Sequence, residues 1–231
     1  MGKQEMMLCG GADEFHPLTA ATFDVMNAGS IGYNQQPEST PRPFDRDRDG
    51  VVCAEGCGIL LLESLDSARH RGATILAELT GFATVSAPTN IAHPDAAAMA
   101  QCMRLALADA GTDVDAVDYV NAHATGTDHG DIAESEAIFE LFGGRVPVSS
   151  LKGHIGHTMA ASGSLELVAV IDMMQRGQLI PTRNLDQVDP GCEQIRHVIG
   201  LEPAELNVAI KNNFALGGVN SSIVLRRYQN D

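Results

Sequence analysis

Two short segments of this chain place two histidines and a lysine in turn-like settings. The first, AHATGT, contains His123, and the second, KGHIGHT, contains Lys152 and His157. A third segment, NNFALGGVNS, has consecutive glycines Gly217 and Gly218, where the backbone can approach a ligand and direct amide N–H groups at a developing oxyanion. No cysteine has the surroundings of a nucleophile. These residues predict half of an active site.

His123 follows an apolar segment, and in α/β sheets the carboxyl ends of strands present functional side chains to a ligand. Asp131 and Glu134 lie three residues apart, so both can share one face of the next predicted helix. A plainer interpretation stays open for two of these residues. Asp131 is also a favourable first-turn acid, and His123 can be a structural histidine at the end of a strand.

Lys152 and His157 follow a second short apolar segment and are predicted to share the mouth of the site with His123. A buried lysine is costly without an acid, and we expect Glu134 to be its partner. The alternative is a surface pair of little energetic value. The small residues at 160–163 (AASG) would permit very close packing at the start of the following helix.

Composition limits the function classes. The 231 residues are 44% hydrophobic and carry a formal charge of −15, which repels nucleic acid and anionic membrane surfaces. No apolar run approaches the roughly 20 residues of a membrane-spanning helix, and no signal segment begins the chain, so we expect a cytoplasmic protein. The odd number of cysteines favours reduced, packed thiols: Cys9, Cys53, Cys57, Cys102 and Cys192.

Two alternative motif interpretations are rejected. The letters HIGH at 154–157 also occur in one class of aminoacyl-tRNA synthetases, but here they lie late in the chain and no lysine-rich loop follows. A zinc site formed by His123, His154 and His157 lacks a cysteine or carboxylate at ligand spacing. We therefore expect no metal and no cofactor.

Strand and helix patterns alternate along the chain and predict an α/β fold with about seven strands and four helices. A long loop is predicted over 34–50. Strands are predicted at 5–9, where Gly10 and Gly11 close the first strand, and at 58–63, 75–84, 116–122, 146–149, 208–212 and 221–227. Helices are predicted at 64–71, 95–110, 131–142 and 159–175.

Taken together, the motifs resemble the C-terminal part of the β-ketoacyl-[acyl-carrier-protein] synthases, the condensing enzymes of fatty-acid and polyketide synthesis. The resemblance rests on His123 in NAHATGT, on Lys152 and His157 in SSLKGHIGHTMAASG, and on NNFALGGVN at 212–220. Residues 43–58, with PFD, RDG and EGCG, are similar to the PFD, RDG and GEGAG stretch of that family.

The resemblance implies a thiolase-like fold of two similar α/β halves. Residues 1–72 would be a remnant of the N-terminal half, and residues 73–231 would be the C-terminal half. The family's nucleophilic cysteine lies upstream of the strand at 5–9, so this chain would have no nucleophile. We then expect exposed apolar faces, self-association, and no condensation by the chain alone.

In that family, condensation decarboxylates a malonyl thioester to an enolate that attacks an acyl thioester. His123 and His157 match the two histidines that stabilise the enolate oxygen, and Lys152 with Glu134 match the residues that orient them. The loop residues Phe214, Leu216, Gly217 and Gly218 match the oxyanion loop. Implied partners are an acyl carrier protein, carrying malonyl or acyl phosphopantetheine, and the missing N-terminal half in cis or in trans.

Two departures from the family pattern concern specificity, and three arginines concern docking. Leu216 stands where the family has a gating phenylalanine, and HATGT replaces the HGTST of fatty-acid enzymes. Arg42, Arg46 and Arg48 are candidates for carrier-protein docking, although the acids between them also predict an internal salt-bridged loop. The alternative function is a non-catalytic partner subunit, similar to a chain-length factor or to one part of a split enzyme.

Overall fold

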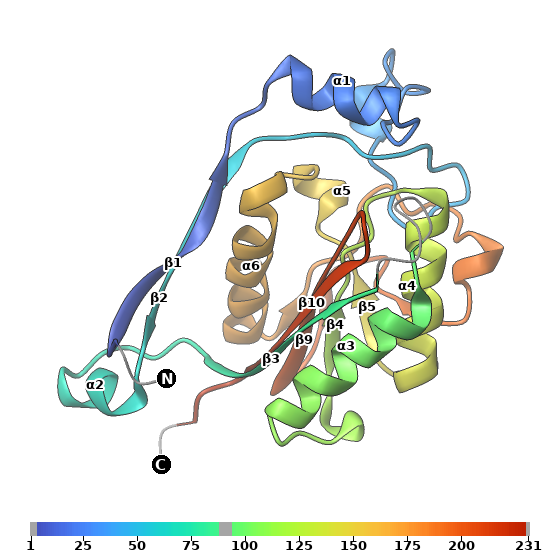
Figure 1. Cartoon of the computed structure of the whole chain (residues 1–231). Coiled ribbons are helices and arrows are strands. Elements are labelled where there is room, and N and C mark those ends of the chain that lie inside the picture. Colours follow the sequence, from blue (N-terminus) through green and yellow to red (C-terminus); the bar gives the residue numbers. More distant parts are fainter. Residues whose placement is uncertain (1–3, 88–93, 230–231) are drawn as a thin grey trace.

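A six-stranded mixed sheet forms the centre of the computed structural model, which describes residues 4–87 and 94–229 (Figure 1). The strand order is β3-β10-β9-β4-β5-β7. The first three strands are antiparallel: β3 (Glu78–Ser86), β10 (Val219–Arg226) and β9 (Val208–Ala215). The others run parallel: β4 (Tyr119–Asn121), β5 (Pro147–Ser149) and β7 (Arg196–His197). The predicted α/β class is confirmed.

Helices cover both faces of this sheet, because its strands alternate apolar side chains between two cores. One core packs against α3 (Ala96–Asp109) and α4 (Asp128–Phe142) and takes Ile210 from β9. The other packs against α6 (Ser162–Arg176) and takes Ala209 from the same strand. Asp95 caps α3 by accepting the backbone N–H of Ala98 at 3.1 Å. The site residues are thus held between two independent cores.

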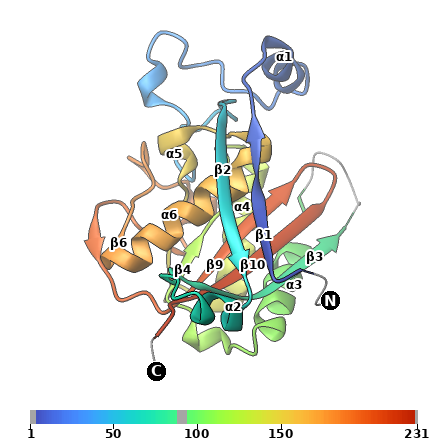
Figure 2. The same cartoon turned by 90° about the vertical axis from the view of Figure 1, so that its left-hand side faces the viewer.

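A separate antiparallel ribbon lies on the side of α6 that faces away from the six-stranded sheet (Figure 1), in front of α6 in Figure 2. It pairs β1 (Met6–Asp13) with β2 (Gly56–Glu63) from Met6 opposite Glu63 to Asp13 opposite Gly56. The prediction that Gly10 and Gly11 end the first strand is wrong. Both glycines continue the strand, opposite Ile59 and Gly58. A Cβ on Gly11 would lie 1.9 Å from the carbonyl oxygen of Ala160, so glycine permits the close packing expected at residues 160–163.

The connection between the ribbon strands contains a helix that the sequence patterns did not predict, α1 (Pro17–Val25). No α1 residue is buried, so the helix does not contribute a buried face to either core. Pro17 starts the helix and the His16 ring caps it. The remaining short elements are α2 (Leu65–His70), α5 (Lys152–Ile155), β6 (Gln178–Leu179), β8 (Glu202–Pro203) and the 3₁₀ turns Pro37–Ser39, Val114–Ala116, Met159–Ala161 and Pro190–Cys192.

The long loop before β2 is fastened to the rest of the fold by buried arginines. Arg48 is 5% exposed and donates to Asp189 at 2.7 Å and to the carbonyl oxygen of Thr127 at 3.2 Å. Arg42 bonds Asp45 and, at 2.7 Å, Asp186. Two of the three docking candidates are therefore internal, as the salt-bridged-loop alternative predicts. Arg46 stays half-exposed beside Asp47.

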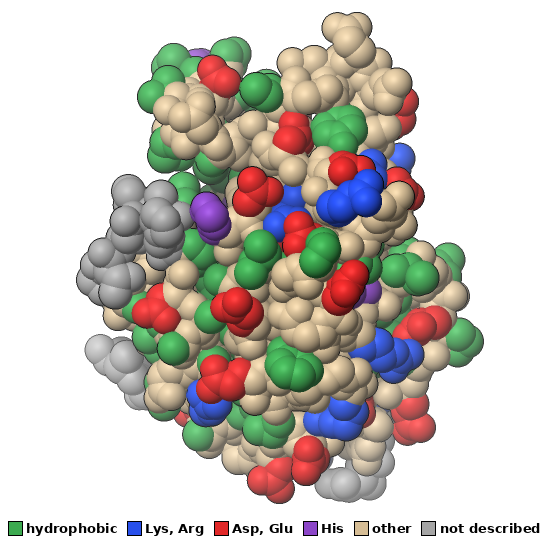
Figure 3. All heavy atoms as spheres, turned by 90° about the vertical axis from the view of Figure 1, so that its right-hand side faces the viewer, with side chains coloured by type: hydrophobic (Ala, Val, Ile, Leu, Met, Phe, Trp, Pro, Cys, Tyr) green, Lys and Arg blue, Asp and Glu red, His purple; other side chains and the backbone are tan. Residues whose placement is uncertain are grey.

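On one side of the molecule the acidic side chains are spread out rather than gathered at one place (Figure 3). Figure 3 shows Asp and Glu side chains scattered across the side of the molecule on which α4 lies. Among the described residues, no helix combines the length and apolar character needed to cross a bilayer.

Candidate active site

The imidazole rings of His123 and His157 lie side by side beyond the carboxyl ends of the parallel strands β4 and β5. Their centroids are 5.3 Å apart and their planes are nearly perpendicular, at 83°. His123 follows the end of β4, and His157 follows α5, the short helix after β5. The two motifs are 34 positions apart in sequence, and the parallel pairing of β4 with β5 brings them together.

Glu134 fixes the backbone that carries His123. Its carboxylate accepts the N–H of His123 at 2.9 Å and the N–H of Ala124 at 2.7 Å, and it also accepts the side-chain amide of Asn212 at 3.2 Å. Burial raises the pKa of Glu134, and the two backbone hydrogen bonds oppose that rise. The segment after β4 therefore has one orientation, held by α4 from one side and by β9 from another.

His157 is held by the chain that leads into β2. Its N–H donates to the carbonyl oxygen of Val52 at 2.8 Å, and its carbonyl accepts the N–H of Ala54 at 2.9 Å. The preceding Gly156 has φ +68°, and a Cβ there would lie 2.8 Å from the Ala54 Cβ. The His157 Nδ1 accepts the N–H of Met159 at 3.2 Å, so in the neutral ring the proton resides on Nε2.

The prediction that Glu134 pairs with Lys152 is wrong. The Lys152 ammonium instead contacts Glu166 at 2.6 Å, and both side chains are fully buried. The two acids lie on helices that cover opposite faces of the sheet, Glu134 on α4 and Glu166 on α6. Lys152 begins α5 beside α6, and the Glu134 oxygens are already occupied by backbone N–H groups.

A second buried lysine completes this ion cluster. Lys211, in the middle of β9, contacts the other Glu166 oxygen at 2.6 Å and is 1% exposed. Two ammonium groups thus flank one carboxylate, and we call Lys152, Glu166 and Lys211 the charge trio. Ser162 adds a hydroxyl donor to Glu166 at 3.3 Å. Such a buried cluster is stable only while its charges remain paired.

The surroundings keep both imidazoles neutral. Burial, reinforced by the positive charges of Lys152 and Lys211, lowers the pKa of His157 to about 3. Burial and the same lysines, together with His157 itself, hold the pKa of His123 well below its ordinary value. A neutral imidazole carries one N–H, which can donate to an oxygen that gains negative charge.

The glycine segment forms the turn between β9 and β10. Gly217 and Gly218 have φ +81° and +77°, which favours glycine. Phe214 is buried in the core shared with α3 and α4, whereas the Leu216 side chain is half-exposed at the turn. The predicted turn is confirmed. The loop's role toward an oxyanion remains a prediction.

None of the five cysteines, all in the described part of the chain, begins an α-helix. Burial raises the pKa of Cys53 and of Cys102, and it raises the pKa of Cys192 to about 12. A reactive cysteine needs the opposite shift, because the thiolate is the nucleophile. These three thiols are therefore structural.

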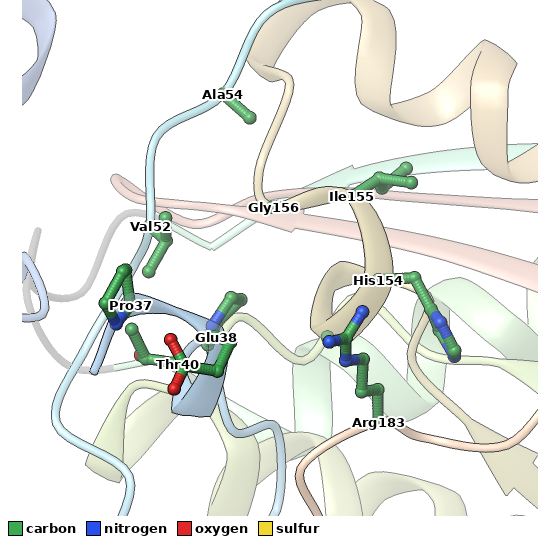
Figure 4. Close-up of a pocket in the computed structure, with 11 residues that line it drawn as sticks. Pro37, Glu38, Thr40, Val52, Ala54, His154, Ile155, Gly156 and Arg183 are labelled. Atoms are coloured by element: carbon green, nitrogen blue, oxygen red, sulfur yellow. The ribbon is translucent and has the colours of Figure 1, made fainter. Parts of the chain in front are cut away.

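The other histidine of the HIGH motif, His154, belongs to different surroundings. His154 is exposed, and its Nε2 donates to the carbonyl oxygen of Pro181 at 2.8 Å. It lines a cavity of about 280 Å³ that neither His123 nor His157 lines. Figure 4 shows His154 with Arg183 on one side of this cavity and Val52 on the other. No group of three His, Cys, Asp or Glu suited to a metal ion occurs among the described residues.

Two family models match the chain in succession. The beta-ketoacyl synthase N-terminal domain matches residues 1–68, and the beta-ketoacyl synthase C-terminal domain matches residues 76–186. The chain belongs to the β-ketoacyl synthase family. Both histidines, Lys152, Glu134 and Glu166 lie within the match to the C-terminal domain, whereas Lys211 lies beyond it.

Individual members of the β-ketoacyl synthase family align with almost the whole chain. The chloroplastic 3-oxoacyl-[acyl-carrier-protein] synthase II of Arabidopsis thaliana is 39% identical over 99% of this chain and 43% of its own length. A beta-ketoacyl synthase from Burkholderia phymatum is 46% identical with a TM-score of 0.96, over 99% of this chain and 56% of its own.

A third relative is a ketosynthase in complex with a type II polyketide synthase acyl-carrier protein and bound to a hexaketide. It is 34% identical with a TM-score of 0.93, over 99% of this chain and 57% of its own. The fold is therefore thiolase-like. The chain spans about half the length of the relatives it matches.

The sequence interpretation missed Glu166 and Lys211 because neither stands in a recognisable β-ketoacyl synthase motif. Glu166 lies between Leu165 and Leu167 in a helix with a buried face, and Lys211 follows the apolar run Val-Ala-Ile. A single charge at a core-facing position was the available signal, since a fully buried charge requires a partner.

Proposed function

We propose that this chain supplies the C-terminal portion of a 3-oxoacyl-[acyl-carrier-protein] synthase, in which His123 and His157 stabilise the enolate formed from a malonyl thioester. The observation that carries this proposal is the pair of imidazole rings, 5.3 Å apart, whose neutral form is favoured by burial and by the lysines of the charge trio. When CO₂ leaves the malonyl group, the electron pair of the broken bond passes to the enolate oxygen. The Nε2–H of His157 and the N–H of His123 donate to that oxygen.

Carbon–carbon bond formation then needs an acyl thioester on a cysteine, whose thiolate is the leaving group. None of the cysteines in this chain, all of them among the described residues, begins an α-helix, and burial raises the pKa of three of them, Cys53, Cys102 and Cys192. The cysteine is therefore supplied by a further half, in cis or in trans. In this proposal the 231-residue chain alone does not condense, and its carrier-protein partner brings malonyl or acyl phosphopantetheine.

The outer face of the ribbon is the proposed contact for that half. Leu8 is 72% exposed, Ile59 54% and Leu61 47%, and Leu8 pairs directly with Leu61. An exposed apolar patch of this kind marks an interaction surface. In the absence of the other half, we expect two copies of this chain to associate through it.

The test joins this chain to a cysteine-bearing N-terminal half from a relative, by fusion or by co-expression, and measures condensation of acyl- and malonyl-carrier protein. We expect turnover from the joined enzyme and none from the 231-residue chain. His157→Ala in the joined enzyme should lower the rate roughly 100-fold or more, as removal of an oxyanion donor does. Full turnover by the chain alone would refute the proposal, and a joined complex that binds carrier protein without condensing would support a partner-subunit role instead.

The proposed boundary near residue 72 has its own test. Residues 73–231 hold the sheet and its helices, whereas residues 4–71 form the ribbon, α1, α2 and the loop. We expect limited proteolysis to cut first before residue 72, because few buried apolar contacts protect that part. Early cleavage within the last 150 or so residues would contradict this division.

A further inference from the structure

The chain contains only three lysines, at positions 3, 152 and 211, and two of them meet at Glu166. Lysine is seldom fully buried unless it is paired. One lysine suffices to neutralise one carboxylate, and Lys152 already contacts Oε1 of Glu166 at 2.6 Å. Lys211 therefore does more than balance the charge, because with it the trio carries a net charge of +1.

The register of β9 directs neighbouring residues toward different parts of the site. Successive side chains of a strand point to opposite faces of the sheet. Lys211 reaches Glu166 on α6, whereas Asn212 reaches Glu134 on α4 at 3.2 Å. On its two sides in the sheet, Lys211 pairs with Asn121 of β4 and with Ile223 of β10. It thus stands next to β4, the strand that precedes His123.

All the hydrogen-bonding capacity of the Lys211 ammonium is used. It contacts Glu166, donates to the carbonyl oxygen of Asn212 at 2.7 Å and donates to the side-chain oxygen of Asn213. An ammonium group has three N–H donors, and here each has an acceptor. Lys211 is thus fixed in place and is not available as a nucleophile.

We infer that Lys211 is a second cationic positioning residue of the site. It holds Glu166 from the strand side and, with Lys152, maintains positive charge behind the imidazoles, so that both rings remain neutral N–H donors. The contribution to catalysis rests on the proposed function, whereas the electrostatic contribution can be measured in the chain itself. Lys211 acts through the histidines and does not touch the substrate.

Charged groups on α4, α5 and α6 act on Lys211. Glu166 of α6 and Glu134 of α4 favour its charged form, and Lys152 of α5 disfavours it. The Tyr119 hydroxyl on β4 lies in the field of Glu166 and bonds Ser149 at 2.7 Å. Burial is the largest influence and lowers the pKa of Lys211 to about 8. The positive charge is therefore present at neutral pH and is lost on moderate alkalinisation.

The test observes the histidines by NMR in the 231-residue chain, with ¹³C-labelled imidazoles. As the pH rises from 6.5 to 9.5, we expect the His123 and His157 resonances to shift with a midpoint near 8, although neither ring titrates in that range. Lys211→Met should abolish this step, and Lys211→Arg should abolish it while keeping the low-pH behaviour of the wild type. In Lys211→Met, histidine protonation should begin about one pH unit higher than in the wild type.

A second label keeps the test decisive if Lys211→Met does not fold. With ¹³Cε-lysine in the wild-type chain, Lys3→Arg and Lys152→Arg assign the signals. The Lys211 signal should then titrate with the same midpoint as the histidine step. Different midpoints, or a histidine step that persists in folded Lys211→Met, would overturn the inference.

The catalytic consequence is measured in the joined enzyme of the preceding section. Lys211→Met should lower kcat for malonyl decarboxylation roughly tenfold with KM unchanged, and Lys211→Arg should restore most of the rate at neutral pH. If the joined wild-type enzyme shows no reaction while the NMR step is present, the proposed function fails and the electrostatic role stands. If the reaction proceeds and Lys211→Met leaves both kcat and the NMR step unchanged, the role of Lys211 is refuted.

Discussion

The two sides of α6 lead to regions that differ in burial: the sheet side is fully packed, whereas the ribbon on the other side has an exposed outer face. Toward the sheet, α6 presents Glu166 and the apolar Val170, both fully buried, and its charge is met by two lysines from other elements. Toward the ribbon, α6 meets the backbone of Gly58 closely enough that a Cβ there would lie 2.7 Å from the N atom of Leu165. The outer face of that ribbon is open, with Leu8 exposed.

The candidate site and the ribbon thus differ in how many of their contacts lie among the described residues. Within residues 4–87 and 94–229, the two imidazole rings contact each other, Glu134 accepts the backbone N–H of His123, and the members of the charge trio contact one another. The ribbon has one packed face only. The imidazole pair and the charge trio are therefore held by internal contacts, whereas the apolar side chains on the outer face of the ribbon are exposed.

The largest effect is expected from Glu166→Gln. The substitution leaves two ammonium groups buried without a counter-charge, which typically costs about 3–5 kcal/mol of unfolding free energy. Asp172→Asn is the matched control, since Asp172 lies on the same helix in a half-exposed pair with Arg176 worth less than about 1 kcal/mol. Urea denaturation measures both variants. Equal losses of unfolding free energy in the two variants would show that the buried charge trio contributes no more to stability than an exposed ion pair on the same helix.

Next in size is the contrast between Ile210→Ala and Ile59→Ala. Ile210 on β9 is fully buried between the sheet and α3 and α4, so its truncation should cost about 2–5 kcal/mol. Ile59 on the outer ribbon face is half-exposed, and its truncation should cost less than about 1 kcal/mol. The same denaturation experiment compares them. A large loss for Ile59→Ala would mean that the ribbon face is already covered within this chain or by a second copy.

The pH dependence of stability reports on the imidazole pair. His157 has a pKa of about 3 in the folded chain, so below pH 6.5 the unfolded chain binds a proton that the folded chain does not, and stability falls. At pH 5.5 the His157 contribution is between about 1 and 2 kcal/mol. Asp131, whose pKa burial raises to about 7, acts with the opposite sign, because its proton is held in the folded chain.

A double difference isolates the histidine. The stability of His157→Asn relative to the wild type should improve by about 1–2 kcal/mol between pH 7.5 and pH 5.5. Ile59→Ala, which keeps the imidazole pair, should show no such change. If His157→Asn and the wild type keep a constant difference, the ring is not held neutral by its surroundings.

Sequence reasoning predicted the α/β class and the meeting of the two histidines for the same physical reason, whereas the thiolase-like fold came from the family resemblance. Periodic apolar segments determine where strands and helices form, and His123 and His157 each follow such a segment at the same end of the sheet. It failed for contacts between side chains that are distant in sequence. The choice of Glu166 over Glu134 as the partner of Lys152 depends on which face of the sheet each helix covers, and local patterns do not contain that information.

The smallest stability effect, and the sharpest test of the open surface, is expected from Leu8→Ser combined with Leu61→Ser. Leu8 and Leu61 are cross-strand neighbours on the outer face of the ribbon, and both are exposed. Their replacement should therefore change stability by no more than about 0.5 kcal/mol. Self-association, measured by sedimentation, should weaken clearly because the apolar patch is removed. Leu105→Ser is the control, since Leu105 is similarly exposed on α3, away from the ribbon. If Leu105→Ser weakens association as much as the ribbon variant does, association reflects general surface hydrophobicity and not a ribbon interface.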